Sequence, residues 1–230
     1  MNILIPMAGK GTRFSVAGYT FPKPLIEIYG KPMIQIVVEN LSLKGQHIFI
    51  VQKSHSDVYN LEAVLNAISP GCKIMITRGI TEGAACTTLL AKGLINDEPL
   101  VIANSDQWIK WNPYDFHEAM AGVDGGILTF RSNHPRWSYA RTDGEYVIEV
   151  AEKKPISNIA TVGVYYWRRG TDYVKYAEQM ISKEYRVNGE FYVCPVFNEA
   201  IADGLKIRTF DVGEMWGLGT PEDLQTFLRR

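Results

Sequence analysis

The sequence predicts an α/β fold in which a mainly parallel, Rossmann-like mixed sheet is flanked by helices and carries an added lobe. Short apolar runs of strand length alternate with segments of helical periodicity through the first half of the 230-residue chain, a pattern typical of strands joined by crossover helices. A glycine-rich turn at residues 7–11 directly follows the first apolar run. After Asn133 the pattern changes to that of an antiparallel hairpin, which predicts the added lobe.

The first half of the chain contains five apolar runs that predict buried strands. They lie at residues 2–7, 47–51, 73–77, 100–103 and 126–130. Apolar residues at helical spacing predict a helix over residues 34–41, after Pro32 at a favourable first position, and another over residues 58–68. A third helix is expected over residues 84–91, opened by Gly83. Strands and helices therefore alternate as a parallel sheet requires.

The second half begins with a hairpin. Residues 138–142 and 146–150 flank Asp143-Gly144, a dipeptide that favours a two-residue turn. The next elements expected are a strand at 161–167, a helix at 172–183 and a strand at 206–210. Thr220 as a cap, with Pro221 in the first turn, predicts a helix that closes the chain.

No linker or internal repeat divides the chain. We expect one domain over residues 1–230, with a first part at 1–132 and a second at 133–230. Lys and Arg number 24 against 25 Asp and Glu, a net charge of −1, so no partner is expected among nucleic acids or anionic membranes. The apolar run at the amino end is far shorter than the roughly 18 residues that a membrane span needs.

Three cysteines are widely spaced and form neither a metal-type nor a disulfide pattern. They are Cys72, Cys86 and Cys194. We expect them to be small buried side chains in a cytoplasmic protein, because disulfides are rare in that compartment. The four histidines also lack ligand spacing, and surface or capping roles are expected for them.

The turn after the first strand carries the main chemical signal. Gly9 and Gly11 allow backbone N–H groups to approach phosphate oxygens, and Lys10 and Arg13 add positive charge. The dinucleotide fingerprint lacks its third glycine, because Phe14 stands there, and the G-K-[S/T] ending of nucleotide hydrolases is also missing. The turn predicts a phosphate site of another kind.

Lys23 stands between Pro22 and Pro24, ten residues after Arg13. The two prolines stiffen the backbone, so the ammonium group can be aimed at lower entropic cost than on a flexible loop. A solvated lysine in a surface turn is the alternative reading of this residue taken alone. Beside the glycine-rich turn, we favour a role in phosphate binding.

The combination G-x-G-T-R-F, P-K-P-L and G-K-P-M-I resembles the sugar-phosphate nucleotidyltransferases, the pyrophosphorylase family. The resemblance continues in family order through Glu82-Gly83-Ala84-Ala85, Asn104-Ser105-Asp106, Glu152-Lys153 and residues 217–224. It implies a fold similar to that of GT-A enzymes, with the nucleotide mainly on residues 1–132 and the acceptor mainly on residues 133–230. It leaves homo-oligomerisation open.

The implied reaction is transfer of a nucleoside monophosphate from a nucleoside triphosphate to a phosphorylated small acceptor, such as a sugar, alditol or amino-acid phosphate, with release of pyrophosphate. The residues that the resemblance places on the nucleotide are Ala8, Gly9, Lys10, Gly11 and, near the base, Gly83. Arg13 and Lys23 would stabilise charge on the triphosphate and on the departing pyrophosphate, and Asp106 would hold Mg²⁺. A helix cap without a ligand is the alternative for Gly83, and a turn residue is the alternative for Asp106.

On the acceptor side, the resemblance implies that Glu152 meets acceptor hydroxyls and that Lys153 meets the acceptor phosphate, with Lys154 as a second possible lysine. Glu190 resembles an acceptor-side glutamate of the family. The segment after Glu190 departs from the family's Ile-Thr-Asp, because Val193-Cys194-Pro195 stands there. Two aromatic residues are further candidates for the wall of the acceptor pocket: Trp137 and Tyr139.

The closing segment contains a second departure. Many relatives carry a metal-binding aspartate where this chain has Gly217. Asp211 and Glu214 are nearby candidates for a replacement, although each is more commonly an ordinary turn residue, and water could also fill the position because Mg²⁺ keeps several water ligands.

Two other functions remain open. A glycosyltransferase with a similar sheet would use Asn104-Ser105-Asp106 as its metal motif, but it needs no triphosphate clamp, so Arg13 and Lys23 argue against it. A catalytically silent nucleotide sensor is favoured by Gly217 alone. Within the transferase reading, the start at residues 5–9 resembles members of capsule and surface-polysaccharide pathways. These include cytidylyltransferases that act on alditol, choline or amino-acid phosphates, which favours CTP over dTTP or UTP.

Overall fold

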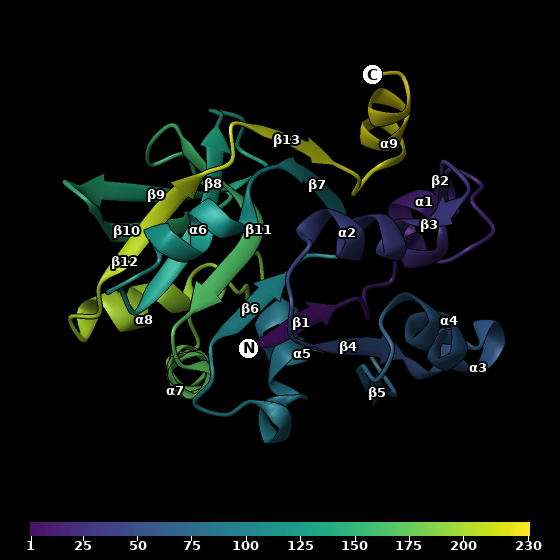
Figure 1. Ribbon diagram of the computed structural model, residues 1–230, viewed down its shortest axis with the longest axis horizontal. Helices are drawn as coiled ribbons and strands as arrows, with labels where there is room; N and C mark the ends of the chain where they lie inside the picture. Colours follow the sequence, from purple (N-terminus) through teal and green to yellow (C-terminus); the bar gives the residue numbers. More distant parts are fainter.

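A computed structural model describes residues 1–230. Its centre is a nine-stranded mixed sheet in the order β10-β9-β11-β6-β1-β4-β5, to which β8 and β12 are joined through β11 (Figure 1). The parallel part consists of β6 (Leu100–Ala103), β1 (Asn2–Pro6), β4 (Gln46–Gln52) and β5 (Lys73–Thr77). The predicted α/β class with a mainly parallel central sheet is therefore confirmed.

The added lobe is built on antiparallel strands. They are β8 (Gly125–Arg131), β9 (Ser138–Asp143), β10 (Tyr146–Glu152) and β11 (Ile159–Trp167). β12 (Ile207–Asp211) returns to pair in parallel with β8. Each strand expected from the sequence is present, including the hairpin around Asp143-Gly144, because alternation and turn chemistry are short-range signals.

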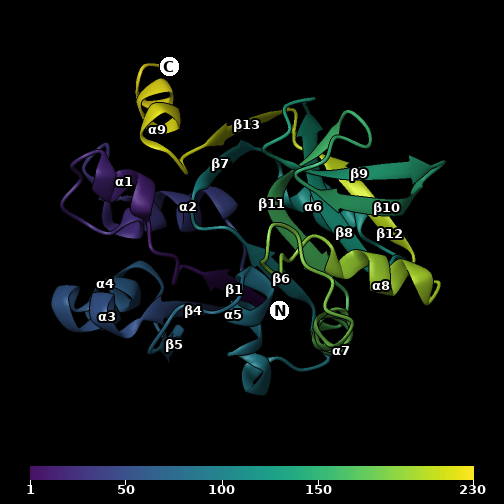
Figure 2. The same ribbon diagram turned by 180° about the vertical axis from the view of Figure 1, so that it is seen from behind.

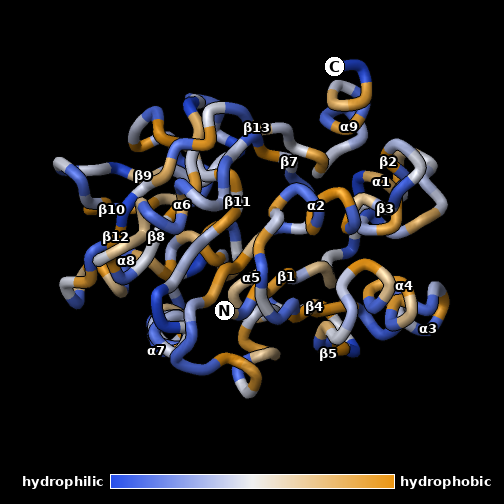
Figure 3. The backbone as a smooth tube through the Cα atoms, viewed as in Figure 1, coloured by the Kyte–Doolittle hydropathy of each residue, from blue (hydrophilic) through white to orange (hydrophobic).

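Helices cover both faces of the sheet (Figures 1 and 2). The helices against one face are α5 (Ala84–Leu89), α7 (Gly170–Ser182) and α8 (Val196–Ala202), and those against the other are α2 (Met33–Leu41), α4 (Leu61–Ile68) and α6 (Pro113–Ala119). The shorter η2 (Lys92–Leu94) follows α5. Two hydrophobic cores of 26 and 22 buried residues result, one on each side of the sheet. Figure 3 shows hydrophobic stretches of chain running through β1, β4 and β6.

The prediction of one helix over residues 58–68 is wrong at its amino-terminal end, because α4 begins at Leu61. Asn60 has a φ of 47°, in the left-handed region, and divides the segment into α3 (Lys53–Tyr59) and α4. Asparagine tolerates this conformation better than most residues. Val58 lies before this break and is 71% exposed to solvent, whereas Leu61 and Leu65 are buried as expected.

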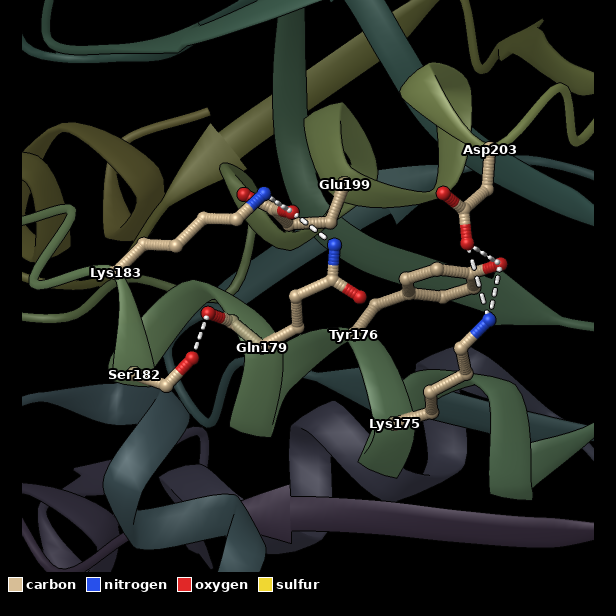
Figure 4. Close-up of polar contacts among 7 residues, drawn as sticks. All are labelled: Lys175, Tyr176, Gln179, Ser182, Lys183, Glu199 and Asp203. Carbon is tan, nitrogen blue, oxygen red and sulfur yellow. Dashed lines mark hydrogen bonds and ion pairs between the residues drawn. The ribbon is translucent and has the colours of Figure 1, made fainter.

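Polar contacts join α7 to α8 (Figure 4). Lys175 Nζ and Tyr176 Oη both donate to Asp203 Oδ2, at 3.0 and 3.1 Å. Gln179 Nε2 donates to Glu199 Oε2 at 2.7 Å. The Trp167 ring of β11 stacks on Tyr176 of α7 and on Phe197 of α8, with ring centroids 6.2 and 4.4 Å apart. The polar residues on this face of α7 therefore hold α8 in place.

The expectation that all three cysteines are buried is confirmed only for Cys194. Cys194 is buried, whereas Cys72 and Cys86 are half-buried, and all three are free. His47 differs from the surface role expected for it, because it lies in β4 at 8% exposure and stacks on Phe49 with ring centroids 5.9 Å apart.

A separate two-stranded ribbon joins the middle of the chain to its carboxyl-terminal part. β7 (Gln107–Lys110) pairs with β13 (Glu214–Gly217), and the chain then enters α9 (Pro221–Leu228). The Thr220 hydroxyl accepts a hydrogen bond from the Asp223 backbone at 3.2 Å, so the expected cap is present. No helix is both long and apolar enough to cross a bilayer.

The closing helix α9 packs on the amino-terminal segment. That segment holds α1 (Thr12–Val16), η1 (Lys23–Leu25), β2 (Glu27–Ile28) and β3 (Lys31–Pro32). Phe14 and Ile28 from the start of the chain bury themselves with Leu224 and Phe227 from its end in a third core. Both views place α9 beside α1 and β2. The carboxyl-terminal residues therefore reach the edge of the sheet at which the glycine-rich turn lies.

Candidate active site

The glycine-rich turn is anchored at its base and exposed at its tip. Ala8 is buried and its carbonyl accepts a 2.6 Å hydrogen bond from Gln52 Nε2. Gly9 and Lys10 are exposed, and Gly11 adopts the left-handed conformation with φ 62° before α1 begins. The exposed tip leaves its backbone N–H groups accessible to an anion.

Lys23 lies directly against this turn. A Cβ atom placed on Gly11 would be 3.5 Å from the Cβ of Lys23. The Lys23 Nζ atom donates a hydrogen bond of 2.8 Å to Asp106 Oδ2, across 83 residues of sequence. Both side chains are 24% exposed, so this ion pair is partly shielded from water. The structure thus brings together the predicted cation and the predicted metal-binding carboxylate.

Asp106 lies between the end of β6 and the start of β7, as expected for a residue after a strand. Its carbonyl accepts a 2.8 Å hydrogen bond from the Leu218 N–H group. A Cβ atom on Gly219 would be only 2.7 Å from Asp106 Oδ2. The segment after β13 therefore passes over the carboxylate, and glycine at position 219 allows that close approach without displacing the Asp106 side chain.

The candidates for a second metal ligand lie elsewhere. Gly217 pairs with Gln107, next to Asp106, but Glu214 pairs with Lys110 at the other end of the ribbon, roughly 10 Å away at 3.3 Å per strand residue. Its carboxylate accepts from Trp216 Nε1 at 2.7 Å. Asp211 accepts from the Gly213 backbone at 2.8 Å instead. No cluster of three metal-ligating side chains occurs in the chain.

The predicted acceptor residues converge around Tyr192. Lys153 Nζ donates to the Tyr192 hydroxyl at 2.5 Å and lies 4.5 Å from the centre of its ring. The same hydroxyl donates to Glu190 Oε2 at 2.8 Å. Lys153 has a φ of 53°, an unusual backbone for a lysine that often marks functional segments. Both Lys153 and Lys154 are exposed, but of the two only Lys153 makes these contacts with Tyr192.

Glu152 lies beside the same cluster. Its carboxylate accepts a short hydrogen bond from the Ser138 hydroxyl. Burial raises the pKa of Glu152, and the Ser138 hydrogen bond and the Lys153 charge act in the opposite direction. A half-buried carboxylate of this kind can accept from, or once protonated donate to, a ligand hydroxyl.

Arg13 connects the glycine-rich turn to this cluster. Its side chain is exposed. Burial raises the pKa of the Tyr192 phenol, Glu190 raises it further, and the positive charge of Arg13 lowers it. Arg13 is therefore close enough to Tyr192 for its charge to act on the phenol. The predicted phosphate and acceptor residues therefore share one region.

The backbone around position 83 requires a glycine for a structural reason that does not involve a ligand. The φ of Gly83 is 133°, and a Cβ there would lie 2.3 Å from the Phe191 carbonyl oxygen. The Ala85 N–H group donates to that oxygen at 3.0 Å, and the Phe191 N–H group donates to the Glu82 carbonyl at 2.8 Å. Glycine is thus required for two backbone segments to meet, and a contact with the nucleotide base stays a prediction.

Tyr139 and Trp137, the two aromatic candidates for the wall of the acceptor pocket, differ in their surroundings. Tyr139 is fully buried, and its hydroxyl donates to the His134 carbonyl at 2.6 Å, so it holds the loop from beneath and does not line a pocket. Trp137 lines a cavity of about 240 Å³ together with Trp216 and Gly217. The expectation of a pocket wall is therefore wrong for Tyr139, because its ring points into the core.

Sequence reasoning missed Tyr192, Ser138 and Arg136. Tyr192 directly precedes Val193-Cys194-Pro195, the segment that departs from the family pattern, and that departure was the available signal. Ser138 and Arg136 carry none, because their partners, Glu152 and Asp223, are brought to them by strand pairing and by α9.

A family model described as nucleotidyl transferase matches residues 3–226. The chain belongs to the nucleotidyl transferase family. The resemblance inferred from the glycine-rich turn is thereby confirmed. Among curated relatives, the bifunctional protein GlmU of Methanocaldococcus jannaschii is 26% identical over 95% of this chain and 52% of its own length. A mannose-1-phosphate guanyltransferase of Schizosaccharomyces pombe is 27% identical over 98% of this chain and 63% of its own.

A solved structure covers the same length. The nucleoside-diphosphate-sugar pyrophosphorylase of Vibrio cholerae aligns over 99% of this chain and 100% of its own, with a TM-score of 0.84 and 26% identity. The chain spans about half to two thirds of the curated relatives described above. Two of these three names refer to substrates, mannose 1-phosphate in one and a nucleoside-diphosphate sugar in the other, and the two differ.

Proposed function

We propose that this protein transfers a nucleoside monophosphate from a nucleoside triphosphate to a phosphorylated small acceptor and releases pyrophosphate. The observation that carries this proposal is the Lys23–Asp106 ion pair, 2.8 Å long, beside an exposed glycine-rich turn. An ammonium group and a carboxylate at the carboxyl edge of a parallel sheet are the groups that a triphosphate and its metal ion require. Membership of the family supports the same class of reaction.

In the proposed reaction, an oxygen of the acceptor phosphate attacks the α-phosphorus. A new P–O bond forms there while the bond to the bridging β-phosphate oxygen breaks, and its electron pair leaves with pyrophosphate. The acceptor phosphate is already anionic near pH 7, so no side chain has to remove a proton. The site must supply positive charge held in position, and Lys10, Arg13 and Lys23 border the glycine-rich turn.

Magnesium fits the donor set at Asp106. One carboxylate without further acidic neighbours suits an ion that keeps several waters and takes its other oxygens from phosphates. When bound, Mg²⁺ would neutralise charge on the triphosphate. Lys23 Nζ donates to Asp106 Oδ2 and packs against Gly11, so the ammonium group lies between the carboxylate that would hold the ion and the turn that would hold the phosphates.

The acceptor would bind on the other side of the site. Lys153 would hold its phosphate, and Glu152 and Glu190 would hold its hydroxyls, a division supported by their shared contacts with Ser138 and Tyr192. Residues 1–132 would then bind mainly the nucleotide and residues 133–230 mainly the acceptor.

We propose CTP as the triphosphate, because the start of the chain resembles cytidylyltransferases. The backbone of residues 8–11 would hold its phosphates and Gly83 would lie near the base. A cytoplasmic role in supplying precursors of capsule or surface polysaccharide would follow from the same resemblance.

The test is a pyrophosphate assay with CTP, UTP, dTTP or GTP, Mg²⁺ and a panel of sugar, alditol and amino-acid phosphates. We expect pyrophosphate only when a triphosphate and an acceptor are both present. We also expect the reverse reaction, because the bonds broken and formed are both phosphoanhydrides. Sugar transfer from a nucleotide sugar without pyrophosphate exchange would support a glycosyltransferase instead. Tight nucleotide binding with no pyrophosphate under any acceptor would support a sensor.

A further inference from the structure

A cavity of about 240 Å³ lies between β13, α9 and the loop before β9. Its apolar walls are Phe130, Trp137, Met215 and Trp216, and its polar walls are Arg136, Asp223 and Thr226, with Gly217 between the two groups. Aromatic walls combined with a few fixed polar groups are typical of small-molecule sites.

Gly217 contributes to the volume of this cavity because it has no side chain. A Cβ atom there would lie 3.4 Å from Trp137 Cη2 and 3.6 Å from Asp223 Oδ2, so any longer side chain would extend into the space between them. The backbone of Gly217 is not in the left-handed region, and nothing in its conformation demands glycine. Glycine at this position therefore has two consequences: the metal-binding carboxylate of many relatives is missing, and additional cavity volume is open.

The charges in the cavity balance. Arg136 Nη1 lies 3.0 and 3.2 Å from the two oxygens of Asp223. The Arg136 guanidinium also lies 4.2 Å from the centre of the Trp137 ring. A cationic ligand would have to displace Arg136 from both positions. A neutral ligand with hydroxyls could instead donate to Asp223, accept from Arg136 and pack its C–H surface on the rings.

The cavity adjoins both halves of the candidate site. The Trp137 carbonyl accepts a 3.0 Å hydrogen bond from the Lys153 N–H group. On the other side, Gly217 is two residues from Gly219, whose Cβ position touches Asp106. A molecule with its phosphate at Lys153 could therefore place its remaining atoms in the cavity.

We propose that the cavity at Gly217 binds the neutral, polyhydroxylated part of the acceptor, with Arg136 and Asp223 as specificity-determining residues. The proposal rests on the proposed function for the identity of the acceptor. Under this proposal, Gly217 takes part in acceptor recognition. The loss of a metal ligand at this position would not by itself give the residue such a role.

The test compares Gly217→Val with Gly93→Val, a matched change at a glycine around which a Cβ meets nothing within 4 Å. Calorimetry measures binding of glucose 1-phosphate, glycerol 3-phosphate, phosphocholine and inorganic phosphate. Filling the cavity should weaken binding of at least one of the two hydroxylated phosphates about tenfold or more, the effect of a modest steric penalty. Inorganic phosphate should bind as before, and Gly93→Val should change nothing.

A second variant tests the charge argument without filling the cavity. Arg136→Ala leaves the Asp223 carboxylate unpaired beside Trp137, so phosphocholine should bind at least several-fold more tightly than to the wild type. The proposal is overturned if Gly217→Val weakens every ligand equally or none, if the hydroxylated phosphates bind the wild type no better than inorganic phosphate, or if Arg136→Ala leaves the preference unchanged. A cavity effect in binding, with no pyrophosphate from any triphosphate, would overturn the proposed function and leave the cavity proposal standing.

Discussion

At the scale of single residues, the site is arranged so that each acidic group already has a basic or hydroxyl partner. Lys23 neutralises Asp106, Arg136 neutralises Asp223, and Ser138 donates to Glu152. Each of these carboxylates is therefore already hydrogen-bonded, and a substrate that carries phosphate would compete with them for the same basic groups.

The first prediction concerns positive charge. Arg13→Ala and Lys23→Ala should each lower turnover by roughly 10²-fold or more, as removal of a preorganised electrostatic partner does. Steady-state pyrophosphate release measures the effect, with Lys44→Ala, an exposed lysine away from the turn, as the control. Wild-type turnover in both variants would show that the charges serve another purpose.

The second prediction concerns the metal ion. Asp106→Asn should abolish most activity and raise the Mg²⁺ concentration needed for the remainder. Calorimetry of the nucleotide-free protein gives an independent measurement. The wild type should bind Mg²⁺ weakly because Lys23 occupies the carboxylate, and Lys23→Gln should bind it more tightly. Equal Mg²⁺ affinity in the two proteins, or normal Mg²⁺ dependence in Asp106→Asn, would contradict this placement.

The third prediction assigns Tyr192 as a positioning residue. Tyr192→Phe keeps the ring beneath Lys153 but removes the hydroxyl between Lys153 and Glu190. The KM for the phosphorylated acceptor should rise about tenfold, the effect of losing a hydrogen bond to a charged group, while kcat and the KM for the triphosphate change little. Tyr114→Phe, at an exposed tyrosine, is the control. A fall in kcat with an unchanged acceptor KM would exclude a positioning role.

At the scale of secondary-structure elements, the β7–β13 ribbon and α9 carry the end of the chain to the site. Residues 217–219 cross Asp106 only because β13 pairs with β7 and α9 packs on the amino-terminal segment. The packing of α9 thus determines both the third core and the position of the segment above the carboxylate.

The fourth prediction tests that coupling. Phe227 is 1% exposed and touches Trp108, Trp216 and Tyr29. Phe227→Ala should lower the free energy of unfolding by about 3 kcal/mol and should also weaken turnover at temperatures where the protein stays folded. Urea denaturation and pyrophosphate release measure the two effects. Leu228→Ala, at a neighbouring residue with 39% exposure, should change either by much less. Full turnover in a destabilised Phe227→Ala protein would separate α9 from the site.

At the scale of the whole molecule, stability depends on a sheet that is buried on both faces. His47 lies within it, with Nδ1 2.9 Å from the Ser69 hydroxyl and no partner for Nε2. Burial lowers the pKa of His47 from its ordinary value of 6.5. The neutral ring is therefore favoured by folding, and its contribution to stability is present above pH 6.5 and is lost as the pH falls through the folded-state pKa.

The fifth prediction is a pH dependence of unfolding. The free energy of unfolding of the wild type should exceed that of His47→Gln by a margin that narrows on acidification below pH 6.5. Chemical denaturation at a series of pH values measures the margin. Glu152 acts in the opposite sense, because burial raises its pKa and its contribution is lost as the pH rises, so only the difference between the two proteins isolates His47. A margin that is constant with pH would mean that His47 titrates alike in both states.

Much of this architecture follows from short stretches of sequence. The strands, the Asp143-Gly144 hairpin and the cap at Thr220 depend on alternation, turn residues and side-chain hydrogen bonds within a few positions. The glycine-rich turn and the lysine between two prolines were equally visible, because each depends on local backbone conformation. The division of the helix at Asn60 could not be predicted in this way, because a single residue in the left-handed conformation leaves the spacing of the apolar residues unchanged.

Local motifs were sufficient to predict the family, the class of fold and most of the charged groups in the candidate site. How those groups meet became visible only in the folded protein. Lys23 and Asp106 are 83 residues apart, and Arg136 and Asp223 are 87 apart, so neither pair leaves a local signal. The cavity at Gly217 likewise depends on a loop, a ribbon and a closing helix from separate parts of the chain. The physical reason is that turns and strands arise from neighbouring residues, whereas ion pairs and cavities arise from surfaces that only the folded chain brings together.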